Sequence, residues 1–166
     1  LLLPIQITYS LIILIRNKFY DLQVLKSHKF TTKTISIGNL TIGGTGKTPM
    51  VEYLLNAFKN KKIAVLSRGY KRSTKEFIEV NEIHLPSDVG DESFQLYKKF
   101  PNTIIACDNN RVNGLKKIIN AHKDVNLVIL DDGFQHRRLA RDLDIVLTEY
   151  NNLFFNDQLL PIGKLR

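Results

Sequence analysis

Short apolar runs alternate with helical patterns along most of this chain. Five runs rich in β-branched and other apolar residues predict strands, at 34–37, 63–66, 103–106, 127–130 and 143–147. Between them, apolar positions three and four apart predict helices at 47–59, 91–99 and 111–122. Buried strands separated by helices are typical of a mostly parallel sheet with helices on both faces, so we expect a three-layer α/β fold. The weaker pattern at 73–86 predicts a small hairpin or an irregular excursion.

The beginning of the chain has a different pattern. The first fifteen residues carry no charge, and residues 11–15 are all apolar. This run is shorter than the ~20 residues of a transmembrane helix, and it lacks the basic start and cleavage site of a signal peptide. Five cations follow (Arg16, Lys18, Lys26, Lys29 and Lys33), as in a segment resting on an anionic membrane surface. A first helix packed on the core is an equal alternative.

The most informative stretch, residues 43–48, reads Gly-Gly-Thr-Gly-Lys-Thr and joins a predicted strand to a predicted helix. Strand, glycine loop and helix form a phosphate-binding P-loop, whose backbone N–H groups surround the anion. We predict a P-loop NTPase-like fold in which Lys47 reaches the β- and γ-phosphates of ATP and Thr48 ligates Mg²⁺. The predicted nucleotide contacts are Thr41, Ile42, Gly43, Gly44, Thr45, Gly46, Lys47 and Thr48. The alternative is a glycine-rich turn with an incidental lysine, since the general pattern has glycine where Thr41 stands.

Two carboxylates, Asp131 and Asp132, directly follow the apolar run 127–130. Mg²⁺ prefers one or two carboxylates together with phosphate oxygens, so we predict that this pair serves the metal. The pattern does not choose between the two, and a structural cap is the alternative. Because ligands bind beyond the carboxyl ends of parallel strands, the aspartates, the P-loop and Arg68 are expected to meet at one edge of the sheet.

Other candidate site residues each have a structural alternative. Asp91 starts a predicted helix, where its charge stabilises the helix dipole by roughly 0.3–1 kcal/mol. Alternatively, Asp91 orients or deprotonates a hydroxyl that accepts a phosphate. Arg68 is a candidate phosphate or headgroup contact, or one partner of a surface ion pair. Gln135 and His136 are candidate substrate contacts, although a lone loop histidine also serves structural roles.

Composition and charge limit the classes of partner that this chain can bind. A net charge of +8 suits polyanions, anionic lipid surfaces or phosphorylated substrates. The sequence has no aromatic-interleaved RNA motif and no zinc-finger spacing, so we expect no nucleic-acid partner. Cys107 is the only cysteine, which excludes an internal disulfide, fits a reducing cytosol and predicts a buried, inert thiol. No sequence feature fixes an oligomeric state.

Five motifs together resemble the tetraacyldisaccharide 4′-kinases, the lipid A kinases. They occur in the family's order, at 38–49, 66–70, 89–92, 131–136 and 159–166. That family also has threonine at the position of Thr41. The resemblance implies transfer of the γ-phosphate of ATP, with Mg²⁺, to the 4′-hydroxyl of a tetraacyldisaccharide 1-phosphate. It further implies that this acylated lipid is phosphorylated at the cytoplasmic face of the bacterial inner membrane.

The resemblance also implies roles for parts of the chain. Lys47 and Asp91 are then catalytic, residues 1–29 form a membrane-associated segment, and residues 30–166 form the nucleotide-binding lobe. Family members continue past Arg166 into a second lobe with a histidine proposed to assist the carboxylate matching Asp91. We therefore expect this chain to be a fragment, whose own activity stays open. The rival hypotheses are a P-loop kinase of a soluble acceptor and a non-catalytic nucleotide-binding module.

Overall fold

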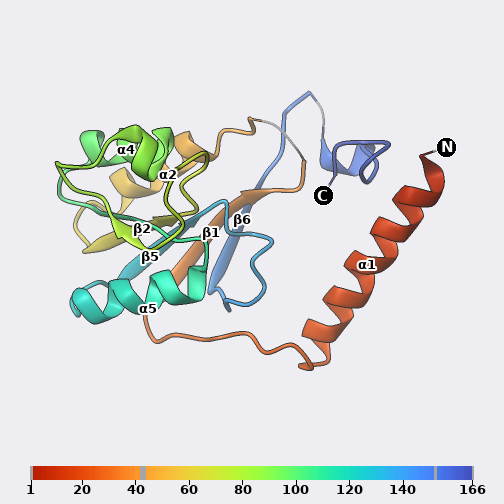
Figure 1. Cartoon of the computed structure of the whole chain (residues 1–166), viewed down its shortest axis with the longest axis horizontal. Helices are drawn as coiled ribbons and strands as arrows, with labels where there is room; N and C mark the ends of the chain where they lie inside the picture. The colour runs from red at the N-terminus through yellow and green to blue at the C-terminus, as the bar shows by residue number, and fades with distance from the viewer. Residues whose placement is uncertain (1, 42–43, 152, 166) are drawn as a thin grey trace.

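The computed structural model describes residues 2–41, 44–151 and 153–165 (Figure 1). In this part of the chain, strands form one sheet in the order β3-β4-β2-β5-β1-β6. All neighbouring strands are parallel except β3 and β4. The strands are β1 (Lys33–Asn39), β2 (Ile63–Ser67), β3 (Ile78–Glu79), β4 (Ile104–Cys107), β5 (Leu127–Asp131) and β6 (Leu143–Leu147). The predicted mostly parallel sheet is confirmed.

Helices cover both faces of the sheet, as predicted (Figure 1). On one face, Val51 and Leu54 of α2 and Leu96 of α4 join a core with Ile37 and Ile129 of the central strands. On the other face, α5 packs into a second core that contains alternate residues of β2, β4 and β5. The helices are α1 (Leu3–Asp21), α2 (Lys47–Ala57), α3 (Pro86–Val89), α4 (Asp91–Lys99) and α5 (Arg111–Ala121), followed by a 3₁₀ turn, Phe154–Asn156.

Each predicted strand and helix matches the observed one to within two residues at both ends. The stretch 73–86 is mainly irregular, as one of the two predicted alternatives has it, and forms no hairpin of its own. Its strand β3 pairs antiparallel with the distant β4. Two residues are too few to leave a period-two pattern, so sequence alone could not locate this strand.

Helix α1 extends away from the sheet (Figure 1), and none of its described residues is buried. The alternative of a first helix packed in the core is therefore wrong. Polar contacts join α1 to the rest of the chain: Arg16 donates to the carbonyl of Gln135 at 3.2 Å, and Arg137 donates to that of Asn17 at 3.2 Å. Arg137 also pairs with Asp21. Among the described residues, no helix combines the length and apolar character required to cross a bilayer.

Candidate active site

The P-loop lysine connects two parts of the sheet edge. Lys47, the first residue of α2, donates from Nζ to Oδ1 of Asn39 at 3.2 Å. Its Nζ also lies 3.8 Å from Oδ1 of Asp132. Asn39 ends β1 and Asp132 directly follows β5, so the ammonium group stands where these neighbouring strands end. The predicted convergence of the glycine loop and the aspartate pair is confirmed.

The other predicted nucleotide contacts lie around this lysine. Gly44 and Gly46 are exposed, and Thr48 is half-buried in the first turn of α2. Thr45 is half-buried, and its hydroxyl has no hydrogen-bond partner among the described residues. Thr41 is buried before the loop, where it forms a backbone bridge with Leu165. Ile42 and Gly43, which were also predicted to contact the nucleotide, lie outside the described residues.

The two aspartates stand in different environments. Asp131 is 3% exposed, and within the described part of the chain its Oδ1 has no hydrogen-bond partner. Burial, reinforced by the nearby charges of Glu92 and Asp132, raises the pKa of Asp131 to about 6. Asp132 is half-exposed, adopts a left-handed backbone conformation with φ 51° and faces Lys47. The buried carboxylate therefore has an oxygen without a partner among the described residues, and the more accessible carboxylate has a cation beside it.

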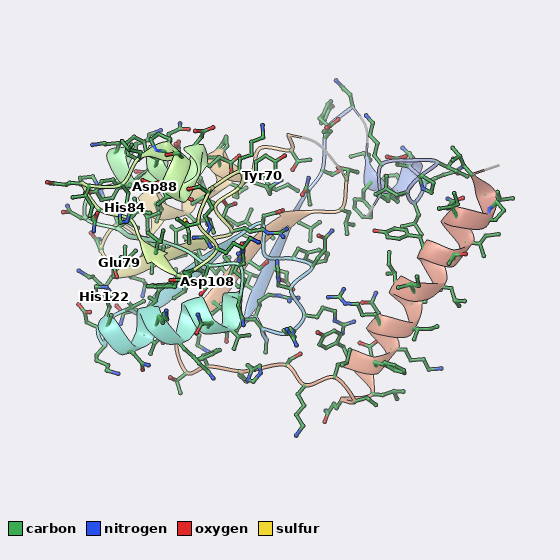
Figure 2. The ribbon with its side chains drawn as sticks, in the orientation of Figure 1. Tyr70, Glu79, His84, Asp88, Asp108 and His122 are labelled. Atoms are coloured by element: carbon green, nitrogen blue, oxygen red, sulfur yellow. The ribbon has the colours of Figure 1, made fainter. Side chains whose placement is uncertain are left out.

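Arg111, a buried arginine that the sequence patterns did not single out, donates a hydrogen bond to the main chain of Asp131. Arg111 is 2% exposed and donates to two main-chain carbonyls, that of Asp108 at 2.5 Å and that of Asp131 at 3.1 Å. Burial lowers the pKa of Arg111 to about 10, so the guanidinium is protonated at neutral pH. Asp108 lies between the end of β4 and the start of α5 (Figure 2), where its side chain accepts hydrogen bonds from Asn110 and Asn113, each at 2.7 Å.

A signal for this arginine was present in the sequence. The segment 108–111 follows the predicted strand 103–106, so the rule that placed the aspartate pair at the sheet edge applied to it as well. The sequence did not show that the side chain of Arg111 points inward. A charged residue at a helix start is usually solvated, so the default expectation was an exposed side chain.

Asp91 is the first residue of α4 and is exposed. No side-chain capping hydrogen bond is present at this helix start. Among the described residues, the carboxylate of Asp91 forms neither a hydrogen bond nor an ion pair. The next residue, Glu92, is close enough for its charge to raise the pKa of Asp131. The first turn of α4 therefore carries one carboxylate that acts on Asp131, and a second, that of Asp91, which has no partner among the described residues.

The remaining candidates occupy the same region. Arg68 is exposed and has no ion pair in the described part of the chain, so the surface ion-pair interpretation is wrong. Burial, together with the charges of Arg111 and Arg68, lowers the pKa of His136 to about 4. His136 is thus neutral at pH 7 and able to donate or accept a hydrogen bond. Gln135 is half-buried, and its side-chain Nε2 has no partner among the described residues.

Close backbone packing holds this histidine segment against the sheet. A Cβ atom added at Gly38 of β1 would lie 2.5 Å from Cβ of Phe134. Only glycine permits this approach, because real Cβ contacts are never so short. The motif that follows the aspartates is therefore seated directly on the strand that leads into the P-loop.

Comparison with known proteins agrees with this arrangement. The sequence model of a family described as tetraacyldisaccharide-1-P 4′-kinase matches residues 1–166. The chain belongs to this family. The resemblance found in the five motifs is thereby confirmed.

Similar proteins show how much of the family's length is present. The tetraacyldisaccharide 4′-kinase of Flavobacterium psychrophilum is 48% identical over 99% of this chain and 48% of its own length. That of Flavobacterium johnsoniae is 43% identical over 100% of this chain and 49% of its own length. The crystal structure of LpxK from Aquifex aeolicus in complex with ATP is 39% identical, with a TM-score of 0.89, over 99% of this chain and 52% of that one. The chain therefore spans about half the length of its relatives, and the predicted fold is confirmed.

Proposed function

We propose that this chain is the nucleotide-binding half of an ATP-dependent lipid kinase. The full-length protein transfers the γ-phosphate to the 4′-hydroxyl of a tetraacyldisaccharide 1-phosphate in lipid A biosynthesis. The observation that carries this proposal is the position of Lys47 between Asn39 and Asp132, in a chain that belongs to the 4′-kinase family. The related LpxK structure holds ATP, which supports ATP as the phosphate donor.

The P-loop binds the donor. Backbone N–H groups of the loop and of the first turn of α2 surround the phosphates, and the positive end of the helix dipole adds to the attraction. Lys47 is held by Asn39 and Asp132, so its ammonium group is oriented before the nucleotide arrives. Such preorganised charge stabilises the phosphates without reorganisation during transfer.

The residues present fit a magnesium ion. Oδ1 of Asp131 is buried without a hydrogen-bond partner in the described part of the chain, as expected for a carboxylate whose natural partner is a cation. Asp131, Asp132 and the hydroxyl of Thr48 would supply the oxygen donors that Mg²⁺ prefers. When bound, the ion neutralises charge on the β- and γ-phosphates. The protein groups set where these phosphates lie.

On the acceptor side, Asp91 takes the proton of the 4′-hydroxyl. Its carboxylate is exposed and forms no hydrogen bond with the described residues, so it is available to a substrate hydroxyl. Arg68 is an exposed cation for a phosphate or headgroup, and the neutral His136 and the amide of Gln135 are placed to bind substrate hydroxyls or phosphate oxygens. These assignments favour a phosphorylated sugar as the acceptor.

Residues 1–29 form the membrane-associated segment, and residues 30–166 form the nucleotide-binding lobe. Apolar side chains of α1 are exposed, among them Ile7, Leu11 and Leu14, and cations follow them. Exposed apolar groups beside basic residues suit peripheral binding to an anionic leaflet. We place the protein at the cytoplasmic face of the bacterial inner membrane. A kinase of a soluble acceptor would have no use for this surface.

The test is transfer of labelled phosphate from ATP to the disaccharide 1-phosphate by the full-length protein. We expect Asp91→Asn to keep the melting temperature and the affinity for Mg-ATP, while transfer falls at least ~10²-fold. Asparagine retains the shape of aspartate but cannot accept a proton. Near-normal transfer by this variant would return Asp91 to a structural role. Hydrolysis or binding of ATP, with no label on lipid, would favour the non-catalytic module.

A further inference from the structure

Three buried polar side chains meet where β2, β4 and the start of α4 come together. Ser67 ends β2, Cys107 ends β4, and Ser93 is the third residue of α4. Their exposures are 5%, 0% and 2% respectively. Oγ of Ser67 lies 2.6 Å from Oγ of Ser93 and 3.4 Å from Sγ of Cys107, and Sγ of Cys107 lies 3.2 Å from Oγ of Ser93. These three residues are termed the hydroxyl–thiol cluster.

The cluster also binds two backbone groups. The N–H of Gly69 donates to Oγ of Ser67 at 3.0 Å, and Sγ of Cys107 donates to the carbonyl of Val89 at 3.3 Å. One arrangement uses each proton once: Ser93 donates to Ser67, Ser67 donates to Cys107, and Cys107 donates to Val89. The cluster therefore ties the turn after β2 to the end of α3 and the first turn of α4.

Gly90 lies between these hydrogen-bonded points, and the backbone there is closely packed. Gly90, the residue before Asp91, has φ 88°, a conformation that other residues rarely adopt. A Cβ atom there would lie 2.8 Å from the carbonyl oxygen of Tyr70 and 3.1 Å from the carbonyl carbon of Gly69. The chain entering α4 thus rests directly on the turn that the cluster holds.

Asp91 has no comparable support of its own. Within the described part of the chain its carboxylate forms no hydrogen bond or ion pair, so its position depends on the backbone that carries it. That backbone is fixed on one side by Gly90 and on the other by Ser93. We propose that the hydroxyl–thiol cluster positions Asp91 for transfer, with Ser93 as the positioning residue. The proposal rests on the proposed function, in which Asp91 activates the acceptor hydroxyl.

The first experiment compares Ser93→Ala with Ile118→Val in the full-length protein. Ile118 is fully buried in α5 on the opposite face of the sheet, so its truncation destabilises the fold without touching α4. We expect Ser93→Ala to lower kcat about tenfold while KM for ATP stays within about twofold, because a small misplacement of a catalytic group affects the chemical step. At the same temperature, well below both melting transitions, Ile118→Val should keep kcat. Equal kcat values for the two variants would overturn the proposal.

A second experiment tests whether Ser93 acts through Asp91. If it does, the double variant Asp91→Asn/Ser93→Ala is no slower than Asp91→Asn alone. A further tenfold loss in the double variant would show an independent, merely structural effect and would overturn the proposal. The proposed function fails separately, by normal transfer in Asp91→Asn. If Asp91→Asn transfers phosphate slowly while Ser93→Ala transfers it at the normal rate, only the positioning role of Ser93 is refuted.

A third pair of variants applies even if Ser93→Ala does not fold. Cys107→Ser keeps a donor for the carbonyl of Val89, and Cys107→Ala removes it. We expect Cys107→Ser to retain kcat within about threefold and Cys107→Ala to lose about tenfold, with KM for ATP unchanged in both. Equal kcat values for the serine and alanine variants would refute a role for the hydrogen-bonded cluster.

Discussion

Replacing Asp131 with asparagine should make the metal-free protein more stable. The pKa of Asp131 rises from its usual 3.8 to about 6 because the carboxylate is buried and two other carboxylates lie near. At about 1.36 kcal/mol per pKa unit, the ionised side chain costs the fold roughly 3 kcal/mol at neutral pH. The neutral amide removes this cost but leaves a buried polar group without a partner. We therefore expect a net gain of about 1–2 kcal/mol.

The raised pKa of Asp131 also fixes how its contribution to the free energy of unfolding changes with pH. The folded state binds this proton more tightly than the unfolded state, so the contribution of Asp131 to stability is fully present below pH ~4 and is lost as the pH rises through ~6. Lowering the pH from 7.5 to 5 should therefore bring the parent closer in stability to Asp131→Asn. Taking the difference between the two proteins cancels the titration of other groups, His136 included.

The assay is denaturant unfolding of this chain in the presence of a chelator, at pH 7.5 and at pH 5. Asp132→Asn is the matched control: its carboxylate is half-exposed and faces Lys47, so neutralising it should give no gain in stability. A second measurement adds Mg-ATP, which should stabilise the parent more than Asp131→Asn. If Asp131→Asn is no more stable than the parent at pH 7.5, or if the difference does not shrink at pH 5, the reasoning from burial is wrong.

Two further predictions concern the nucleotide and the membrane. Lys47→Ala should weaken binding of Mg-ATP far more than binding of AMP, because AMP lacks the β- and γ-phosphates; equal losses by calorimetry would contradict the role of Lys47. Deleting residues 1–15 should release the full-length protein from anionic vesicles in a sedimentation assay, and added salt should weaken binding of the parent only in part because apolar burial remains. Unchanged vesicle binding after the deletion would refute the membrane role of α1.

The buried centre of the fold could be predicted from the sequence because its strands are covered on both faces. Such strands appear as continuous apolar runs, and β2, β4 and β5 were located within a residue of their observed ends. The rule that ligands bind at the carboxyl ends of parallel strands then sufficed to place the P-loop and Asp131 at one edge of the sheet. Both the strands and the site residues at their ends could be predicted because each apolar run is at least four residues long and continuous in the sequence.

Features that depend on side-chain direction or on distant pairing could not be predicted. The sequence around Arg111 does not show that its guanidinium turns inward to bind the ends of β4 and β5. The first helix posed a related problem, because an uncharged segment suits either a core or a membrane surface. The absence of buried residues among those described in α1 decides against the core. The hydroxyl–thiol cluster joins residues up to 40 positions apart, which no local pattern records.

Arg111 connects the ends of β4 and β5 through main-chain carbonyls. Its guanidinium binds the main-chain oxygen of Asp131 and leaves the carboxylate free. Proton uptake or cation binding at the carboxylate therefore breaks none of the bonds that hold the end of β5 to the end of β4. A guanidinium paired with the carboxylate itself would have to give way at every turnover. The charge of Arg111 still acts on the carboxylate and lowers its pKa, but the hydrogen bonds that hold the strand ends do not depend on the charge state of Asp131.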